Sequence, residues 1–288
     1  MAQLSYLSPS SVDEAVKALS GASARALSGG TDLLVQVRSG RAKPDHIVDL
    51  KRIPGLIGIR SENGGFVIGS ATCGAMLSEH PTLSKIWPGV VEAANLIGST
   101  QVQGRASLAG NLCNASPAAD SVPAMIAARA TCVIAGPSGT REAAVETIVT
   151  GPGKTSLGAG EFIIAFKLPP RGSKASDAYL RLIPRTEMDI AVAGAAVSLA
   201  LDADGVCTSA FVALGAVAPT ALLVADAGQA LVGTRLEAAA LTRMEEAVRA
   251  ACQPISDKRG TADYRTKIAA VLAHRAAVIA WNRAKEQA

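Results

Sequence analysis

Two adjacent prolines, Pro169 and Pro170, divide the chain into parts with different patterns. The apolar run at 161–168 predicts a β-strand, and the prolines must end it because proline lacks the N–H that a strand ladder needs. The next residues, 171–176, are polar and predict a linker. We therefore expect a domain boundary here, with one domain over 1–172 and a second over 173–288.

The second part has strand patterns first and helix patterns afterwards. Apolar runs at 178–182, 191–201 and 207–214 predict three strands, and helical spacing follows near 221–230, 236–251 and 262–285. This order is typical of an α+β domain. We expect a three-stranded antiparallel sheet with helices covering one face.

The first part mixes short strands and helices. Ser11 followed by Glu14 is a capping box that predicts a helix start, and Asn63-Gly64 predicts a hairpin turn. Further strands are expected near residues 25–28, 46–50, 56–59, 66–69, 131–135 and 141–145, and further helices near 72–80, 83–97 and 117–129. This part therefore also belongs to the α+β class.

A glycine turn follows the first of these strands. Gly29 and Gly30 come directly after the strand at 25–28, and Thr31 and Asp32 follow them. Thr31 can cap a helix, and Asp32 complements a helix N-terminus. The order of strand, glycine turn and free N–H groups suits a phosphate.

A second polar segment, residues 107–120, consists of small residues, amides and hydroxyls and closes on one carboxylate. Gly110 allows close approach of a ligand to the backbone, and Pro117 predicts the first residue of a helix with Ser116 as its N-cap. Its other neutral hydrogen-bonding residues are Ser107, Asn111 and Asn114. A cradle for a phosphate-bearing cofactor is one interpretation; an ordinary loop and capped helix, which composition alone favours, is the other.

Composition and motif spacing exclude several other functions. The five cysteines are scattered and never form C-x-x-C, so no zinc or iron–sulfur ligand set is indicated, and the three histidines accompany no hydrolytic motif. The segment at 151–160 lacks the Walker spacing and precedes a strand. A net charge of +4 without a basic run does not indicate nucleic-acid binding.

Membrane and secretory signals are also missing. The apolar run at 190–201 is interrupted by Gly194 and Ser198 and is too short to span a bilayer. The first nine residues lack the basic start and apolar core of a secretory signal. We expect a cytoplasmic protein without a membrane span.

The two polar segments together carry a family resemblance. Residues 27–38 and 101–120 resemble the paired flavin-binding loops of the medium, FAD-binding subunit of molybdenum hydroxylases, the xanthine dehydrogenase and carbon monoxide dehydrogenase family. Residues 153–155, 160–167, 188–191 and 264–265 resemble further segments of that family, so the similarity covers essentially the whole chain. It implies an FAD-binding domain of the vanillyl-alcohol-oxidase type with subdomains over about 1–54 and 55–172, followed by a domain that helps enclose the flavin.

The resemblance also implies the activity. In such enzymes a large subunit holds the molybdenum cofactor and oxidises the substrate, a small subunit holds two-iron two-sulfur clusters, and the medium subunit passes electrons through FAD to an acceptor. The complex is expected to be a dimer of heterotrimers. This chain would then contribute neither a catalytic residue nor a metal ligand, in agreement with its missing cysteine clusters.

The cofactor-binding residues that the resemblance implies fall into three groups. The first loop would hold the FAD diphosphate through Ser28, Gly29, Gly30, Thr31, Asp32 and Leu33. The second would contact the diphosphate and ribityl chain through Ser107, Gly110, Asn111 and Ser116, and Asp120 would accept hydrogen bonds from the ribityl or ribose hydroxyls. Lys167 would lie near the flavin or the adenine, unless it is a solvated lysine at a strand end, and Asp189 and Ile190 would lie over the isoalloxazine ring.

Two departures from the family pattern leave more than one function open. Ala109 stands where the family has glycine, so a positive φ there would be costly, and an assembly subunit without cofactor is compatible with this residue. Thr31 and Asp32 replace the His-Ser of the carbon monoxide enzymes, which favours aromatic N-heterocycles as substrates over carbon monoxide. A carbon monoxide dehydrogenase medium subunit and a stand-alone flavin oxidase, for which Cys113 is the one thiol near the loops, are also compatible with the sequence.

Overall fold

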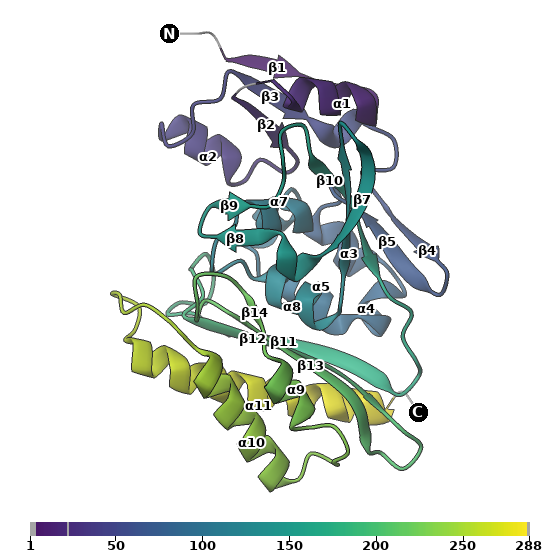
Figure 1. The fold of residues 1–288 in the computed structure, drawn as a ribbon, viewed down its shortest axis with the longest axis vertical. Helices are drawn as coiled ribbons and strands as arrows, with labels where there is room; N and C mark the ends of the chain where they lie inside the picture. The colour runs from purple at the N-terminus through teal and green to yellow at the C-terminus, as the bar shows by residue number, and fades with distance from the viewer. Residues whose placement is uncertain (1–3, 22, 287–288) are drawn as a thin grey trace.

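The structure, a computed structural model, describes residues 4–21 and 23–286 and arranges three main sheets one after another along the long axis (Figure 1). The N-terminal sheet has the order β1-β3-β2 and is parallel throughout. Its strands are β1 (Ser5–Leu7), β2 (Ala24–Leu27) and β3 (His46–Asp49), and the helices α1 (Val12–Leu19) and α2 (Leu33–Arg38) and the short 3₁₀ helix η1 (Leu50–Arg52) accompany them.

The central sheet is antiparallel and has the order β4-β5-β10-β6-β7. Its strands are β4 (Ile59–Glu62), β5 (Gly65–Gly69), β6 (Thr131–Gly136), β7 (Gly139–Ala144) and β10 (Phe162–Leu168). The turn between β4 and β5 is the predicted one: Asn63 and Gly64 have φ of 51° and 79°, as a hairpin turn of this kind requires. The strand before the double proline, β10, lies in the middle of the sheet.

Helices and a small hairpin pack around this sheet. The helices are α3 (Gly74–Glu79), α4 (Leu83–Ile86), α5 (Pro88–Asn95), α6 (Thr100–Gln103), α7 (Leu108–Cys113) and α8 (Ser121–Ala127). The hairpin consists of β8 (Val149–Gly151) and β9 (Lys154–Thr155), with the 3₁₀ helix η2 (Val145–Thr147) before it. Phe166, Ile68, Leu112 and Met125 are fully buried between the sheet and the helices.

Three helix predictions are wrong in detail. The single helix expected over 83–97 is two helices, because Pro88 starts a new one and Trp87 before it has ψ of 59°, outside the helical range. Thr31 is not a cap, since α2 begins at Leu33 after Asp32. Ser116 is not an N-cap either: its hydroxyl accepts from the Ala118 N–H at 3.2 Å within a turn.

The helix expected from Pro117 starts instead at Ser121. Asn111 supplies its capping acceptor, since the Asn111 Oδ1 accepts from the N–H and the hydroxyl of Ser121 at 3.1 and 2.7 Å. The predicted capping box at α1 is half right. Ser11 accepts from the Glu14 N–H at 3.2 Å, but the Glu14 carboxylate accepts from Ser10 instead of Ser11.

The C-terminal sheet has four strands where three were expected, in the order β11-β12-β13-β14. They are β11 (Ala175–Leu182), β12 (Ala193–Leu201), β13 (Cys207–Gly215) and the short β14 (Leu222–Leu223), followed by α9 (Ala225–Gln229), α10 (Ala238–Ala251) and α11 (Ala262–Glu286). Figure 1 shows α10 and α11 on the outer side of this sheet. Its inner side packs on α5 and α8, where Ala196 and Ala213 join the core of the central sheet. Helices therefore cover both faces, not one.

Residues 171–176, which were predicted to form a polar linker, are partly buried. The Arg171 guanidinium lies 3.5 Å from the Trp87 ring centroid and donates to Asp177 at 2.7 Å and to Ser198 at 2.8 Å. The side chains of Arg171 and Asp177 are each only 4% exposed. A buried ion pair thus joins the central helices to the C-terminal sheet.

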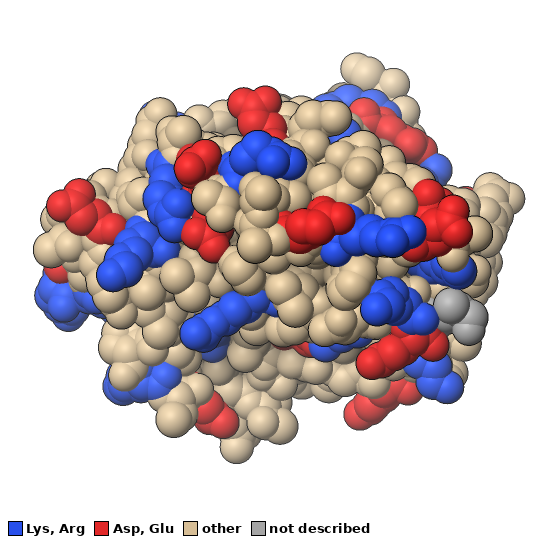
Figure 2. All heavy atoms as spheres, turned by 90° about the horizontal axis from the view of Figure 1, so that it is seen from below, with Lys and Arg blue, Asp and Glu red and all other residues tan. Residues whose placement is uncertain are grey.

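The outer face of the C-terminal part carries both signs of charge. Figure 2 shows Lys and Arg interspersed with Asp and Glu over the end of the molecule that lies lowest in Figure 1. Such a face does not form the basic surface that nucleic-acid binding needs. Among the described residues, no helix is long and apolar enough to cross a membrane.

Candidate functional site

A cleft of about 820 Å³ lies between the N-terminal and central sheets. Three parts of the chain line most of it: residues 23–33, residues 106–114 without Leu108 and Leu112, and the segment from Gly153 to Ile163. Apolar side chains, among them Leu27, Leu50 and Leu157, share the lining with main-chain and side-chain polar groups. The volume and mixed lining are typical of a cofactor site.

Direct hydrogen bonds hold the first two segments together. Ser28 Oγ and Ser107 Oγ are 2.8 Å apart although the residues are separated by 79 positions. Gln36 Nε2 donates to Asn114 Oδ1 at 2.8 Å, and Arg105 Nε donates to the Gly29 carbonyl at 3.1 Å. The two polar segments found in the sequence therefore form one wall.

The glycine turn lies in the cleft lining and has N–H groups without a protein acceptor among the described residues. Among the described residues, no acceptor takes the N–H groups of 29–33, and every one of these residues lines the cleft. Gly30 has φ of 79°, and a Cβ on Gly29 would lie 2.0 Å from the Arg105 carbonyl oxygen. Successive N–H groups in such a turn form a concave site for an anion. The first loop thus fits a diphosphate.

The second segment is helical where the sequence suggested a strained loop. Ser107 caps α7 by accepting from the Gly110 N–H at 3.1 Å, and Ala109 lies inside this helix without a positive φ. The expected cost at Ala109 therefore does not arise. The left-handed residue of the segment is Ala115, with φ of 50°. Ser107, Gly110 and Asn111 line the cleft as predicted from the resemblance, and Asn111 keeps its Nδ2 free because only its Oδ1 has partners among the described residues.

A third wall of the cleft is formed by residues that were not predicted for the site. The Gly153 N–H donates to the Ala115 carbonyl at 2.9 Å, which places the β8–β9 hairpin against the second segment. Thr155, Leu157 and Gly160 follow it along the cleft. The high glycine content of residues 151–160 was a signal for a binding segment, but the missing Walker spacing gave no information on where these residues lie in the fold.

Basic and acidic side chains both reach the cleft. Arg25, Arg41 and Lys43 line its N-terminal end, and their closeness in sequence to the glycine turn is a signal that could have found them. Desolvation raises the pKa of the Asp32 carboxyl. The pKa of Glu161 falls to about 2, mainly because Arg141 binds both its oxygens, at 2.6 and 2.7 Å. The cleft therefore offers more positive than negative charge at neutral pH.

Five predicted residues do not line the cleft: Ser116, Asp120, Lys167, Asp189 and Ile190. Asp120 is 8% exposed and accepts from Arg181 at 2.6 Å and from the Tyr179 hydroxyl at 3.2 Å. Burial raises its pKa even with Arg181 beside it. Lys167 pairs with Glu142 on the exposed side of the central sheet.

Comparison with known proteins gives two family models that together span most of the chain. The FAD binding domain in molybdopterin dehydrogenase matches residues 2–171, and the CO dehydrogenase flavoprotein C-terminal domain matches residues 178–279. The chain is 36% identical to the carbon monoxide dehydrogenase medium chain of Afipia carboxidovorans, with 97% of each chain covered.

Two further relatives agree. A putative xanthine dehydrogenase FAD-binding subunit of Escherichia coli is 33% identical over 84% of this chain and 83% of its own length. Among solved structures, a chain of reconstituted CO dehydrogenase from Oligotropha carboxidovorans superposes with a TM-score of 0.93 at 35% identity, and 98% of both chains is covered.

Proposed function

The chain belongs to the FAD-binding subunits of the molybdopterin dehydrogenases, and from this premise we propose how it holds its cofactor and its place in a complex. It is the medium, FAD-binding subunit of a heteromeric molybdenum hydroxylase, whose partners are a large molybdenum-cofactor subunit and a small iron–sulfur subunit. Bound FAD would supply a redox centre that can take electrons one at a time from iron–sulfur clusters and pass them to an acceptor. Membership of this family argues against a stand-alone flavin oxidase.

The FAD diphosphate is proposed to bind the N–H groups of residues 29–33. The observation that carries this proposal is that five successive residues of the cleft lining have N–H groups without protein acceptors, where the backbones of Gly29 and Arg105 approach too closely for a side chain on Gly29. Ser107, Gly110 and Asn111 are proposed to contact the cofactor from the second wall. Ser116, Asp120 and Lys167 are not assigned to the cofactor, because the first bonds within its own turn and the others form ion pairs outside the cleft lining.

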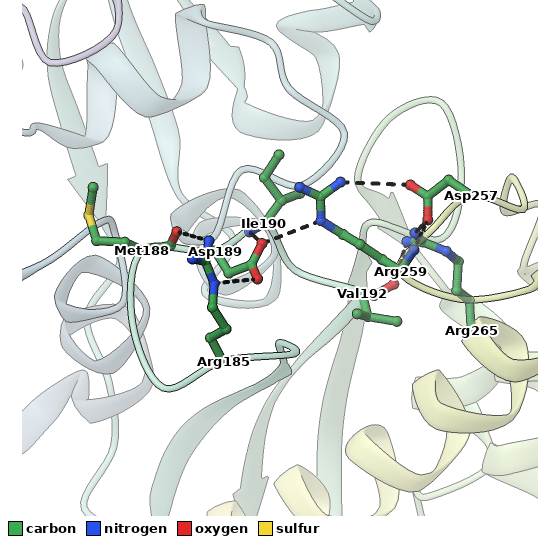
Figure 3. A network of polar contacts seen from close by, with 8 residues as sticks. All are labelled: Arg185, Met188, Asp189, Ile190, Val192, Asp257, Arg259 and Arg265. Carbon is green, nitrogen blue, oxygen red and sulfur yellow. Dashed lines mark hydrogen bonds and ion pairs between the residues drawn. The ribbon is translucent and has the colours of Figure 1, made fainter.

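Ile190 is proposed to cover the isoalloxazine ring from the C-terminal side, as the resemblance implies. Two observations support this placement. The Ile190 side chain is 52% exposed, and Figure 3 shows it pointing away from α11 toward the earlier parts of the chain drawn in blue and teal. An apolar side chain left open to solvent suits a flat ring that is added later.

The assembly and the substrate are the finer parts of the proposal. We place this subunit in a cytoplasmic dimer of heterotrimers that acts on an aromatic N-heterocycle. Thr31 and Asp32 favour that substrate class over carbon monoxide. The relatives include both carbon monoxide and xanthine dehydrogenase subunits at similar identity, so the large subunit must decide the substrate.

The test is spectroscopic. The complex, purified with its partners, should be yellow and should contain one FAD per medium subunit, and substrate should bleach the flavin band only when the molybdenum subunit is present. A colourless, folded complex that still turns over would refute the proposal. Acid precipitation should release all the flavin, since we propose no covalent bond to Cys113.

We expect Lys167→Met to leave FAD affinity unchanged, because Lys167 pairs with Glu142 and does not line the cleft. The matched variant Lys43→Met should raise the Kd for FAD about two- to fivefold, as expected when one exposed cation of the cleft lining is lost. Fluorescence titration of flavin-depleted protein measures both. If FAD binds more weakly to Lys167→Met but not to Lys43→Met, Lys167 belongs to the FAD site and this prediction is wrong.

A further inference from the structure

The loop between β11 and β12 holds apolar side chains in the solvent. Met188 is 57% exposed with φ of 54°, and Ile190 is 52% exposed. Figure 3 shows both side chains on the same side of the loop, away from Arg265 and α11. Exposed apolar side chains do not stabilise a loop that only connects two strands. The contacts that fix the position of Ile190 therefore matter for the ring that it is proposed to cover.

Asp189, between these two residues, fixes the loop. Its Oδ1 accepts from the Ile190 N–H at 2.8 Å and from Arg259 Nε at 3.3 Å, and its Oδ2 accepts from Arg185 Nε at 3.1 Å. The N–H of Ile190 is the main reason that the pKa of the Asp189 carboxyl is lowered. Charge-assisted bonds of this kind hold the carboxylate, and with it the adjacent backbone of Ile190.

Arg259 connects this carboxylate to the helical layer. The Arg259 N–H donates to Asp257 Oδ1 at 2.8 Å, and the same oxygen accepts from Arg265 Nη2 at 2.6 Å. Arg265, on α11, is 4% exposed and also donates to the Val192 carbonyl at 2.8 Å. Arg265 therefore holds the segment that carries Arg259, through Asp257, and also the backbone that follows Ile190, at Val192, as Figure 3 shows.

The two arginines at Asp189 are not equivalent. The Arg185 side chain is 69% exposed and lies on the same loop, whereas the Arg259 side chain is 23% exposed and comes from the segment before α11. An exposed ion pair within a loop contributes little. Of the two, Arg259 connects the loop to a rigid part of the molecule, and Arg185 provides a matched control.

We propose that Arg259 is a positioning residue that holds Ile190 over the flavin and thereby limits how acceptors reach it. This inference rests on the proposed function, because it places the ring under Ile190. Reoxidation would transfer two electrons from bound reduced flavin to dioxygen, with two protons from the flavin and solvent, and would yield oxidised flavin and hydrogen peroxide. The position of Ile190 decides how often dioxygen reaches the ring. Electron transfer from the iron–sulfur subunit brings no diffusing molecule to the ring face, so it should not depend on this cover.

The experiment separates the two half-reactions in the whole complex by stopped-flow absorbance. Arg259→Gln should raise the rate constant for reoxidation of the flavin by dioxygen about three- to tenfold, the size of effect expected for a loosened cover. Flavin content and the rate of flavin reduction by substrate should stay unchanged. Arg259→Lys, which keeps the charge, should restore most of the wild-type rate, and Arg185→Gln should match wild type.

A second comparison asks whether Arg259 acts through Ile190. Ile190→Ala should raise the reoxidation rate as Arg259→Gln does, and the double variant should be no faster than the faster single variant. If the two effects multiply in the double variant, the proposal is wrong. It is also wrong if Arg259→Gln leaves the reoxidation rate unchanged or alters the rate of flavin reduction. Failure of the proposed function would look different, because wild-type complex would then contain no reducible flavin.

Discussion

Replacing Gly29 with alanine is expected to remove most of the bound FAD from the complex. The new Cβ would lie 2.0 Å from the carbonyl oxygen and 2.6 Å from the carbonyl carbon of Arg105, and both are backbone atoms that cannot turn aside. The two walls must then separate by more than an ångström, which breaks the contact of Ser28 with Ser107 and moves the free N–H groups apart. Overpacking of this kind costs about 1–3 kcal/mol, or about 5- to 150-fold in affinity if it falls on the bound state.

Flavin content after gel filtration and the Kd for FAD measure this effect. Gly151→Ala is the matched control, because no atom lies within 4 Å of its added Cβ and Gly151 has no positive φ. That variant should keep full flavin content. If Gly29→Ala also keeps it, the diphosphate does not lie against residues 29–33.

Replacing Arg171 with methionine is expected to lower the free energy of unfolding by about 3–5 kcal/mol, the usual cost of leaving one charge of a buried pair without its partner. The variant keeps most of the side-chain volume but removes the bonds to Asp177 and Ser198 and the contact with Trp87. Asp177 would remain buried and would keep the bond from the Val90 N–H, at 3.1 Å, without a cation beside it.

The deficit should depend on pH in a defined direction. Burial raises the pKa of Asp177 above its ordinary value, and removing Arg171 takes away the charge that opposes this rise. A folded-state pKa above the unfolded one means that the penalty grows as pH rises, so the variant should recover stability in acid. Urea unfolding at several pH values tests this, with Arg60→Met as the control, because the Arg60–Glu62 pair is exposed and should contribute less than about 1 kcal/mol. If the stability deficit of Arg171→Met stays as large in acid as at neutral pH, this explanation is wrong.

Strand ends could be predicted where their signals are local, whereas the short strands β1, β8, β9 and β14 were missed. The Asn63-Gly64 turn and the double proline at 169–170 mark strand ends whatever surrounds them, and the structure places strands there. Pro88 was an equally local signal for a break, and the apolar spacing of 83–97 concealed it. The start of α8 at Ser121 could not be predicted, because its cap comes from Asn111, ten residues earlier.

Local signals also marked several of the residues that line the cleft. The residues of the first loop and Ser107, Gly110 and Asn111 line the cleft, because each follows a turn or cap that its own neighbours specify. The contacts of Asp120 and Arg171 could not be predicted, because they join distant parts of the chain: Arg181 is 61 residues from Asp120, and Arg171 reaches the Ile86 carbonyl, 85 residues earlier. A single sequence gives no signal for such pairs.

The inner face of the C-terminal sheet has a consequence for synthesis of the protein. Helices α5 and α8 form one side of a core whose other side, including Tyr179, Ala196 and Ala213, is translated about 50 to 125 residues later. When residue 170 leaves the ribosome, these helices still expose apolar surface, and the nascent chain is open to chaperones until β13 emerges. A gene fragment that stops after the double proline would therefore yield an aggregating product instead of a minimal flavin-binding module.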